Sequence, residues 1–262
     1  MATLVCFHAH PDDESIATGG VMARAVDEGH DVVLVVATKG EEGEYPDGFL
    51  DDGETLEQRR VKETMASAGV LGVKAVEWLG YRDSGMIDTP TNENPACFWR
   101  ADVEEAAARL AAILRHHSCD VLTIYDSNGN YGHPDHIQVH RVGVRAAELA
   151  GIAHVYEATM NRDEIKRSLE AMRESAPEGA IPEDAPDEDF EVGVPEEQIT
   201  TCVDVSPWLG RKRESMRAHA SQIAEQSFFL VMPDEMFSLA FGREWFIHRG
   251  VTPTQPWEDR II

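Results

Sequence analysis

The sequence has few cysteines, few basic residues and no long apolar run. Its 4 cysteines among 262 residues lie far apart without a Cys-x-x-Cys pair, which predicts buried free thiols instead of a disulfide scaffold. Lys and Arg number 23 against 48 Asp and Glu, a formal net charge of −25. Because phosphate backbones and anionic lipid surfaces are bound by Lys and Arg, this balance argues against nucleic-acid and membrane partners.

Targeting and membrane signals are also lacking. The N-terminus has no basic stretch followed by a long apolar run, and no run approaches the roughly 18 apolar residues of a membrane span. The sequence therefore predicts a globular, cytoplasmic protein. Ten carboxylates and no Lys or Arg fall within residues 174–198, which predicts a solvated acidic loop.

Short β-rich runs alternate with helical patterns over the first 160 residues. The expected strands lie at 4–7, 32–37, 75–79, 121–125 and 153–156, and the expected helices at 16–28, 56–68, 103–116 and 137–150. Nearly continuous apolar strands suit a parallel sheet covered on both faces. The alternation predicts an α/β fold, a Rossmann-like, doubly wound and mostly parallel sheet flanked by helices.

The remainder of the chain is less regular. We expect helices at 162–173 and 207–224 and a strand at 199–205. No internal repeat or linker divides the chain. The economical interpretation is a single domain over 1–262, with an α/β core at 1–160 and a C-terminal elaboration at 161–262 that contains the acidic loop.

Two polar motifs directly follow two of the expected strands. HAHPDDE occupies 8–14 after the first strand, and YGHPDH occupies 131–136 after the fourth. In this architecture ligands bind beyond the carboxyl ends of the strands, so both motifs fall where a site belongs. Imidazole and carboxylate ligands without cysteine suit a catalytic Zn²⁺ with an open position, and the same ligand types also hold Fe²⁺, Mn²⁺ or Co²⁺.

Other interpretations of the first motif are open at this point. A His-x-His-x-Asp pattern occurs in metallo-β-lactamase-like hydrolases, which place a histidine where this chain has Glu14. A mononucleotide-binding turn needs glycines ahead of the helix, and Gly19 and Gly20 come too late. A third interpretation makes Asp12 and Asp13 caps of the following helix. The second motif at a neighbouring strand end favours one joint site.

The pairing of HPDDE with HPDH resembles the PIG-L/LmbE-like family of zinc-dependent N-deacetylases, which act on acetamido sugars and related amides. The similarity runs from Leu4 to about Ala150 and returns in HASQ at 219–222. This resemblance implies a hydrolase that removes acetate from an N-acetylated amino sugar by attack of zinc-bound water on the acetamide.

The resemblance also implies roles for individual residues. It makes His10, Asp13 and His136 the metal ligands and Asp12 the general base. His133 then stabilises the oxyanion or donates a proton to the leaving amine.

Four neighbouring residues receive weaker assignments. The resemblance has Asp135 orient one of the histidines and Tyr131 reach the bound carbonyl, although the tyrosine ring packing against its loop is the alternative. His8 is expected to pack behind the site, and His140 is a reserve ligand one helical turn after the second motif.

A narrower resemblance is to the mycothiol-pathway deacetylases of N-acetylglucosaminyl-inositol. It rests on GEEGE at 40–44, RVKE at 60–63 and RDSGM at 82–86. It implies that Glu44, Arg60, Asp83 and Met86 contact the sugar or inositol. The alternatives are a solvated loop acid for Glu44 and, for Arg60, an ion pair with an acid of its own helix. Residues 89–99 and the acidic segment match nothing and are expected to form the pocket rim.

Two other functions stay open from the sequence. One is an amidase of thiol conjugates or of another acylated metabolite. The other is a metal- or sugar-binding protein on a catalytically retired scaffold. The expected partner is a small acetamido sugar or amide, and the sequence leaves open whether the chain forms a homo-oligomer.

Overall fold

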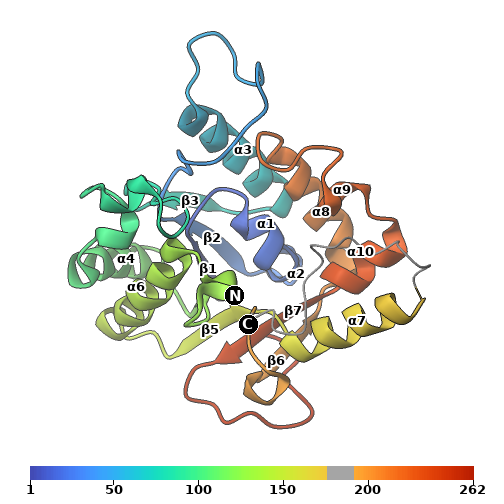
Figure 1. The fold of residues 1–262 in the computed structure, drawn as a ribbon. Helices are drawn as coiled ribbons and strands as arrows, with labels where there is room; N and C mark the ends of the chain where they lie inside the picture. Colours follow the sequence, from blue (N-terminus) through green and yellow to red (C-terminus); the bar gives the residue numbers. More distant parts are fainter. Residues whose placement is uncertain (176–191) are drawn as a thin grey trace.

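The computed structural model describes residues 1–175 and 192–262, and a seven-stranded sheet crosses it in the order β3-β2-β1-β4-β5-β7-β6 (Figure 1). The strands are β1 (Thr3–His8), β2 (Asp31–Val36), β3 (Ala75–Trp78), β4 (Val121–Tyr125), β5 (His154–Thr159), β6 (Thr201–Asp204) and β7 (Arg243–His248). The first five are parallel, whereas β7 runs antiparallel to both β5 and β6. This topology confirms the predicted Rossmann-like, mostly parallel sheet.

Helices cover both faces of this sheet (Figure 1). On one face α2, α3 and α8 pack together, and on the other α4 packs on α6. The helices are α1 (Asp13–Ala17), α2 (Gly19–Asp27), α3 (Leu56–Leu71), α4 (Val103–His116), α5 (Gly129–Gly132), α6 (Pro134–Ala150), α7 (Arg162–Ser175), α8 (Leu209–Ala218), α9 (Phe228–Val231) and α10 (Asp234–Phe241).

The main core lies on the central strands. Residues Leu4 to Phe7 of β1 are completely buried, because helices cover the strand on both sides and leave no solvent face. β1 pairs in parallel with β4, with Leu4 opposite Val121. The carboxyl ends of these two strands therefore lie side by side, and the two polar motifs that follow them are brought together.

Several element boundaries differ from the expected ones. The helix expected at 16–28 is two helices, because the chain leaves the helical conformation at Thr18. α6 begins at Pro134 instead of 137, since proline lacks the N–H that the first helical turn leaves unpaired. α3 continues past residue 68 to Leu71 and ends at Gly72, whose φ of 83° suits glycine.

The C-terminal elaboration differs most from expectation. The helix expected at 207–224 ends at Ala218, and α9, α10 and β7 were not predicted. A small second core of α8–α10 and the adjoining loops includes Met216, Leu230 and Phe237. The acidic segment 174–198 lies mostly outside the described residues.

A buried ion pair joins this elaboration to the α/β core. Lys212 of α8 lies 2.5 Å from Glu244 of β7, and both side chains are almost fully buried. The Glu244 carboxylate also accepts hydrogen bonds from the backbone N–H groups of Gly20 and Val21, at 2.7 and 2.8 Å. The pair therefore ties α8 and β7 to the first turn of α2.

Two further observations bear on the sequence predictions. All four cysteines are free thiols, as expected, and Cys6 and Cys97 are buried. Within residues 1–175 and 192–262, none of the helices combines the length and the apolar character that a membrane crossing requires.

Candidate active site

The two motifs meet beyond the carboxyl ends of β1 and β4. The Asp13 Oδ2 atom lies 3.4 Å from His10 Nδ1 and 3.4 Å from His136 Nε2. Burial opposes ionisation of Asp13, but the two imidazoles outweigh it and hold the pKa of this carboxyl well below its usual range. The three expected metal ligands thus lie together, with the Asp13 carboxylate between the imidazoles of His10 and His136.

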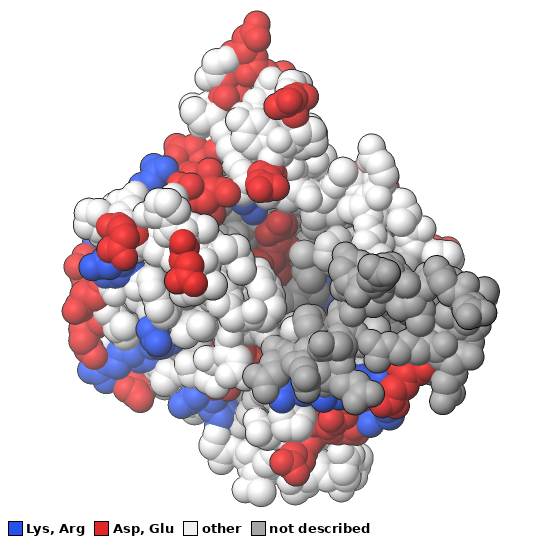
Figure 2. Space-filling model, in the orientation of Figure 1, with Lys and Arg blue, Asp and Glu red and all other residues white. Residues whose placement is uncertain are grey.

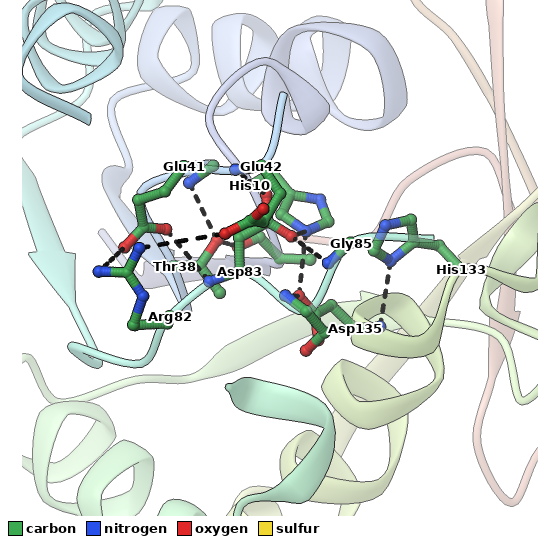
Figure 3. Close-up of polar contacts among 12 residues, drawn as sticks. His10, Thr38, Glu41, Glu42, Arg82, Asp83, Gly85, His133 and Asp135 are labelled. Atoms are coloured by element: carbon green, nitrogen blue, oxygen red, sulfur yellow. Dashed lines mark hydrogen bonds and ion pairs between the residues drawn. The ribbon is translucent and has the colours of Figure 1, made fainter. Parts of the chain in front are cut away.

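His10 is oriented by carboxylates on its other ring nitrogen. Its Nε2 lies 3.2 Å from Asp135 Oδ2 and 3.4 Å from Asp83 Oδ1 (Figure 3). In the neutral ring, a proton on Nε2 is donated to these acids, and the Nδ1 lone pair is then directed to the side of Asp13. Burial disfavours the charged imidazole, but the three surrounding carboxylates raise the pKa of His10.

The donor set fits a metal ion. Both ring nitrogens of His136 are buried and lack a hydrogen-bond partner among the described residues. A buried nitrogen left unpaired costs free energy, and a coordinated cation would supply the missing partner. Ligand atoms of His10, His133 and His136 lie within 4.8 Å of one another, as do those of His10, Asp83 and Asp135. Asp13, the third predicted ligand, is in neither group, although it lies 3.4 Å from both His10 and His136.

Asp12 stands beside this cluster in an unusual backbone conformation. Its φ is 99°, a region that residues with a Cβ rarely adopt. It occupies the N-cap position of α1, but its side chain makes no capping hydrogen bond, so helix capping does not account for it. Burial raises the pKa of its carboxyl to about 6, with the positive charge of Arg60 acting against the shift.

Arg60 is buried and reaches the first motif from α3. Its guanidinium donates to the carbonyls of Pro11 at 2.5 Å and Gly40 at 2.8 Å, and lies 3.3 Å from Asp12 Oδ1. The expected alternative, a pair with an acid of its own helix, is therefore wrong. A Cβ on Gly40 would lie 2.2 Å from this guanidinium, so the close approach requires glycine there.

His133 caps α6 and faces the other two histidines. Its Nδ1 accepts the backbone N–H of Asp135 at 3.1 Å, which places the proton of the neutral ring on Nε2. Burial and then the nearby His10 and His136 lower the pKa of His133 to about 4. A neutral donor at Nε2 suits contact with a developing oxyanion. Tyr131 is half exposed. Its ring stands edge-on to that of His136, with 4.9 Å between the ring centroids.

The four expected substrate contacts fall into two groups. Arg60 and Asp83 are buried inside the site, and Asp83 accepts the backbone N–H of Gly85 at 2.8 Å (Figure 3). Glu44 and Met86 are exposed. Figure 2 shows a hollow near the centre of the molecular surface in this view, over the region of α1, with acidic side chains in it.

His8 of the first motif and His140, one helical turn after the second motif, lie outside the metal-ligand clusters. His8 is bonded to the Tyr125 hydroxyl at 2.7 Å and to Thr18 at 2.8 Å, so it packs behind the site as expected. His140 is bonded to the Tyr125 carbonyl at 3.0 Å. Neither belongs to the three-ligand groups found in the described part of the chain.

Ser84 was missed by the sequence interpretation. Its backbone N–H and hydroxyl both donate to the Asp135 carboxylate. Its carbonyl accepts from Thr91 at 2.8 Å and Asn92 at 2.6 Å, and its hydroxyl accepts the Trp99 N–H at 2.9 Å. The segment 89–99, expected to form the rim, thus also holds the residue that fixes Asp135.

Glu14, Ser67 and His219 form a second group that was missed. The Glu14 side chain is fully buried and accepts hydrogen bonds from Ser67 at 2.5 Å and His219 at 2.6 Å. A signal was present on α3, where Arg60 and Ser67 stand seven residues apart and so share one helix face. That polar face is buried against the site.

Comparisons with known proteins show which proteins this chain resembles. The model of the PIG-L family, described as GlcNAc-PI de-N-acetylase, matches residues 5–147. A protein of Thermomonospora curvata named 1D-myo-inositol 2-acetamido-2-deoxy-alpha-D-glucopyranoside deacetylase is 41% identical over 261 residues, covering 91% of this chain and 87% of its own. A protein of the same name from Nocardiopsis dassonvillei is 43% identical over 266 residues, covering 94% of each chain.

Solved structures share the fold at lower identity. The conserved protein TT1542 of Thermus thermophilus matches with a TM-score of 0.58 and 22% identity, covering 98% of this chain and 99% of its own. The N,N'-diacetylchitobiose deacetylase of Pyrococcus horikoshii matches with a TM-score of 0.54 and 22% identity, covering 90% and 73%.

The same fold also carries a different named reaction. GalB of Pseudomonas putida KT2440, a 4-carboxy-2-hydroxymuconate hydratase, matches with a TM-score of 0.58 and 17% identity, covering 97% of this chain and 99% of its own. The fold by itself therefore does not determine the reaction. The family match and the sequence relatives do establish kinship: this chain belongs to the PIG-L family.

Proposed function

We propose that the chain is a cytoplasmic, zinc-dependent N-deacetylase that removes acetate from an N-acetylglucosaminyl-inositol-like sugar. The observation that carries the proposal is the meeting of His10, Asp13 and His136 beside Asp12. The ring nitrogens of His136 have no hydrogen-bond partner among the described residues. The names of the sequence relatives support the substrate class. We treat residues 1–262 as one deacetylase domain, because β6 and β7 extend the sheet of the α/β core.

The residues of the site have different roles in amide hydrolysis. His10, Asp13 and His136 would hold the metal. When bound, zinc would polarise the acetamide carbonyl and make water a stronger acid. Fe²⁺, Mn²⁺ and Co²⁺ suit the same ligands. Asp12 takes the proton of the attacking water, for which a carboxylate with a pKa of about 6 is well matched near neutral pH.

His133 acts on the other side of the acetamide. Its Nε2–H donates to the oxyanion that develops on the carbonyl oxygen, and the proton that Asp12 took from water passes to the leaving amine. Asp135 keeps His10 in one tautomer through the 3.2 Å contact with Nε2. Tyr131, half exposed beside His136, contacts the acyl group at the open side of the site.

Substrate selection is assigned to the two groups of flanking residues. Asp83 and Arg60 line the inner wall and bind hydroxyls close to the acetamide. Glu44 and Met86, both exposed, contact the inositol end of the substrate. This arrangement predicts that the second ring contributes to binding.

A substrate panel tests the proposal. Acetate release is measured from N-acetylglucosaminyl-inositol, from N-acetylglucosamine and from the amide of a thiol conjugate. We expect the highest kcat/KM for the first compound. Cleavage of the conjugate alone would replace the proposal with the amidase function. A metal-loaded protein that releases no acetate from any of them would favour the binding-protein function.

A further inference from the structure

A buried hydrogen-bond network connects the C-terminal part of the chain to the backbone of Asp12. His219, at the C-cap of α8, is completely buried, and its Nε2 lies 2.6 Å from Glu14 Oε1. The Ser67 hydroxyl donates to the same oxygen at 2.5 Å. The other oxygen of Glu14, Oε2, accepts the backbone N–H of Asp12 at 3.0 Å. Two hydrogen bonds thus separate His219 from Asp12.

The backbone of Asp12 needs such support. Its φ of 99° and ψ of −32° form a strained conformation that persists only where the surroundings hold it. The Asp12 carbonyl is held by the first turn of α1, through the N–H groups of Ser15 at 3.0 Å and Ile16 at 3.3 Å. Its N–H is held by Glu14. These two attachments fix the backbone of Asp12, and its carboxylate is contacted in addition by Arg60, 3.3 Å from Oδ1.

Glu14 depends in turn on His219. A fully buried carboxylate needs charge-assisted donors, and Glu14 finds them in His219 and Ser67. Without the Nε2–H of His219, the carboxylate would keep one side-chain donor and be free to turn away from the Asp12 N–H.

His219 is itself fixed in place from the other side. Its carbonyl accepts the backbone N–H groups of Gln222 at 2.9 Å and Ile223 at 2.7 Å. Ser221 donates twice to Glu63 of α3, at 2.9 and 2.6 Å. The loop after α8 is therefore anchored on the same α3 face that carries Ser67, and the imidazole is held toward Glu14.

We propose that His219 is a positioning residue for deacetylation, which acts through Glu14 to hold the backbone of Asp12 so that its carboxylate faces the site. The inference rests on the proposed function, in which Asp12 is the general base. It also gives a role to the HASQ segment at 219–222, which has none in the function proposed for the two motifs.

The test compares His219→Leu, His219→Gln and a matched control, Lys212→Met. Leucine removes the donor, whereas glutamine offers a side-chain N–H close to the position of Nε2. Lys212 lies on the same helix, but its ammonium group pairs with the buried Glu244 carboxylate instead of with Glu14. For each variant we would measure kcat and KM for the acetamido sugar, bound metal per chain and the thermal unfolding midpoint.

We expect His219→Leu to lower kcat about 100-fold, because a small displacement of a catalytic group has effects of this size. KM and the metal content should stay at the wild-type values. His219→Gln should recover most of the lost kcat. Lys212→Met should lower the unfolding midpoint but keep the wild-type kcat well below that temperature.

Three results would overturn the inference: wild-type kcat in His219→Leu, an equal loss of kcat in His219→Leu and Lys212→Met, or loss of metal together with activity. If His219→Leu fails to fold, Ser67→Ala takes its place, with a smaller loss of kcat expected and an unchanged kcat contradicting the inference. A wild-type protein that releases no acetate would instead overturn the proposed function, so the two failures are distinguishable.

Discussion

Two buried polar clusters of this protein differ in how completely their groups are paired. The Lys212–Glu244 ion pair is closed, since the carboxylate meets an ammonium group and two backbone N–H groups. The site beyond β1 and β4 is open, since both ring nitrogens of the buried His136 lack hydrogen-bond partners among the described residues. The closed cluster joins elements of the fold. The open one has capacity left for a cation and a substrate.

The two clusters also differ in backbone strain. At the open site Asp12 has a φ of 99°, whereas Lys212 and Glu244 lie in a regular helix and a regular strand. Strain persists where surrounding contacts enforce it, and it collects at functional sites. Substitutions in the open cluster should therefore change the reaction, and substitutions in the closed cluster should change stability.

The largest effect is expected for Asp12→Asn. The amide keeps the size of the side chain but cannot take a proton, so kcat should fall about 1,000-fold. Metal content and the unfolding midpoint should remain close to wild type. Steady-state acetate release and elemental analysis provide the two measurements. A kcat near the wild-type value would show that another group is the base.

The pH dependence of kcat/KM also tests the role of Asp12 as the base. The base works only as a carboxylate, and the pKa of Asp12 is raised by burial to about 6. The logarithm of kcat/KM should therefore be level above this pH and fall with unit slope as the pH drops below it. A profile that stays flat down to pH values well below 6 would contradict this role of Asp12.

Lys212→Met should affect stability and not chemistry. Removing one partner leaves the Glu244 charge buried without its counter-ion, which costs about 3–5 kcal/mol in the free energy of unfolding. Arg145, exposed and paired with Glu104, is the control, because Arg145→Met should cost under about 1 kcal/mol. Denaturant titration measures both. Equal losses in the two variants would remove the distinction between a buried and a surface pair.

Ser84→Ala tests the support of the open cluster. The variant removes the hydroxyl that donates to Asp135, so the Asp135–His10 contact loosens and kcat/KM should fall about 10-fold. Kinetics at saturating metal and at limiting metal separate a loss of metal affinity from a loss of turnover. An unchanged kcat/KM under both conditions would contradict a supporting role for Ser84.

The smallest effect is expected at the rim. Glu44→Gln should raise KM for the glucosaminyl-inositol substrate about 3- to 10-fold with kcat unchanged, the size expected for one hydrogen bond. Asp47→Asn, an exposed acid on the same loop, is the matched control and should leave KM unchanged. If both variants raised KM equally, general loop charge would explain the effect and Glu44 would have no specific contact.

The sequence predicted the central part of the fold well, and physical reasons explain why. β1, β2 and β4 are mostly apolar because both faces are covered, and such runs are recognised without knowledge of their neighbours. β7 was missed because it carries Glu244 in a buried position. The charge becomes compatible with burial only when Lys212 and the start of α2 supply partners, which no local pattern reveals.

The same reasoning applies to the site. His10, Asp12, Asp13, His133 and His136 were predicted as site residues because their motifs follow strands and because the two motifs together resemble those of a known family. Glu14, Ser67 and His219 were not assigned, since they come from α1, α3 and the end of α8, and their hydrogen bonds span 53 and 205 residues. Polar residues on one face of α3 resemble a solvent face until α8 is placed against them.

Elemental analysis of the wild type, Asp12→Asn and His136→Ala, beside their acetate release, tests the central claim most directly. We expect about one zinc ion per chain in the wild type and in Asp12→Asn, and almost none in His136→Ala. Acetate release should fall about 1,000-fold in Asp12→Asn and be lost in His136→Ala. A wild-type chain that holds no metal after reconstitution, or a His136→Ala chain that holds as much as the wild type, would contradict this claim.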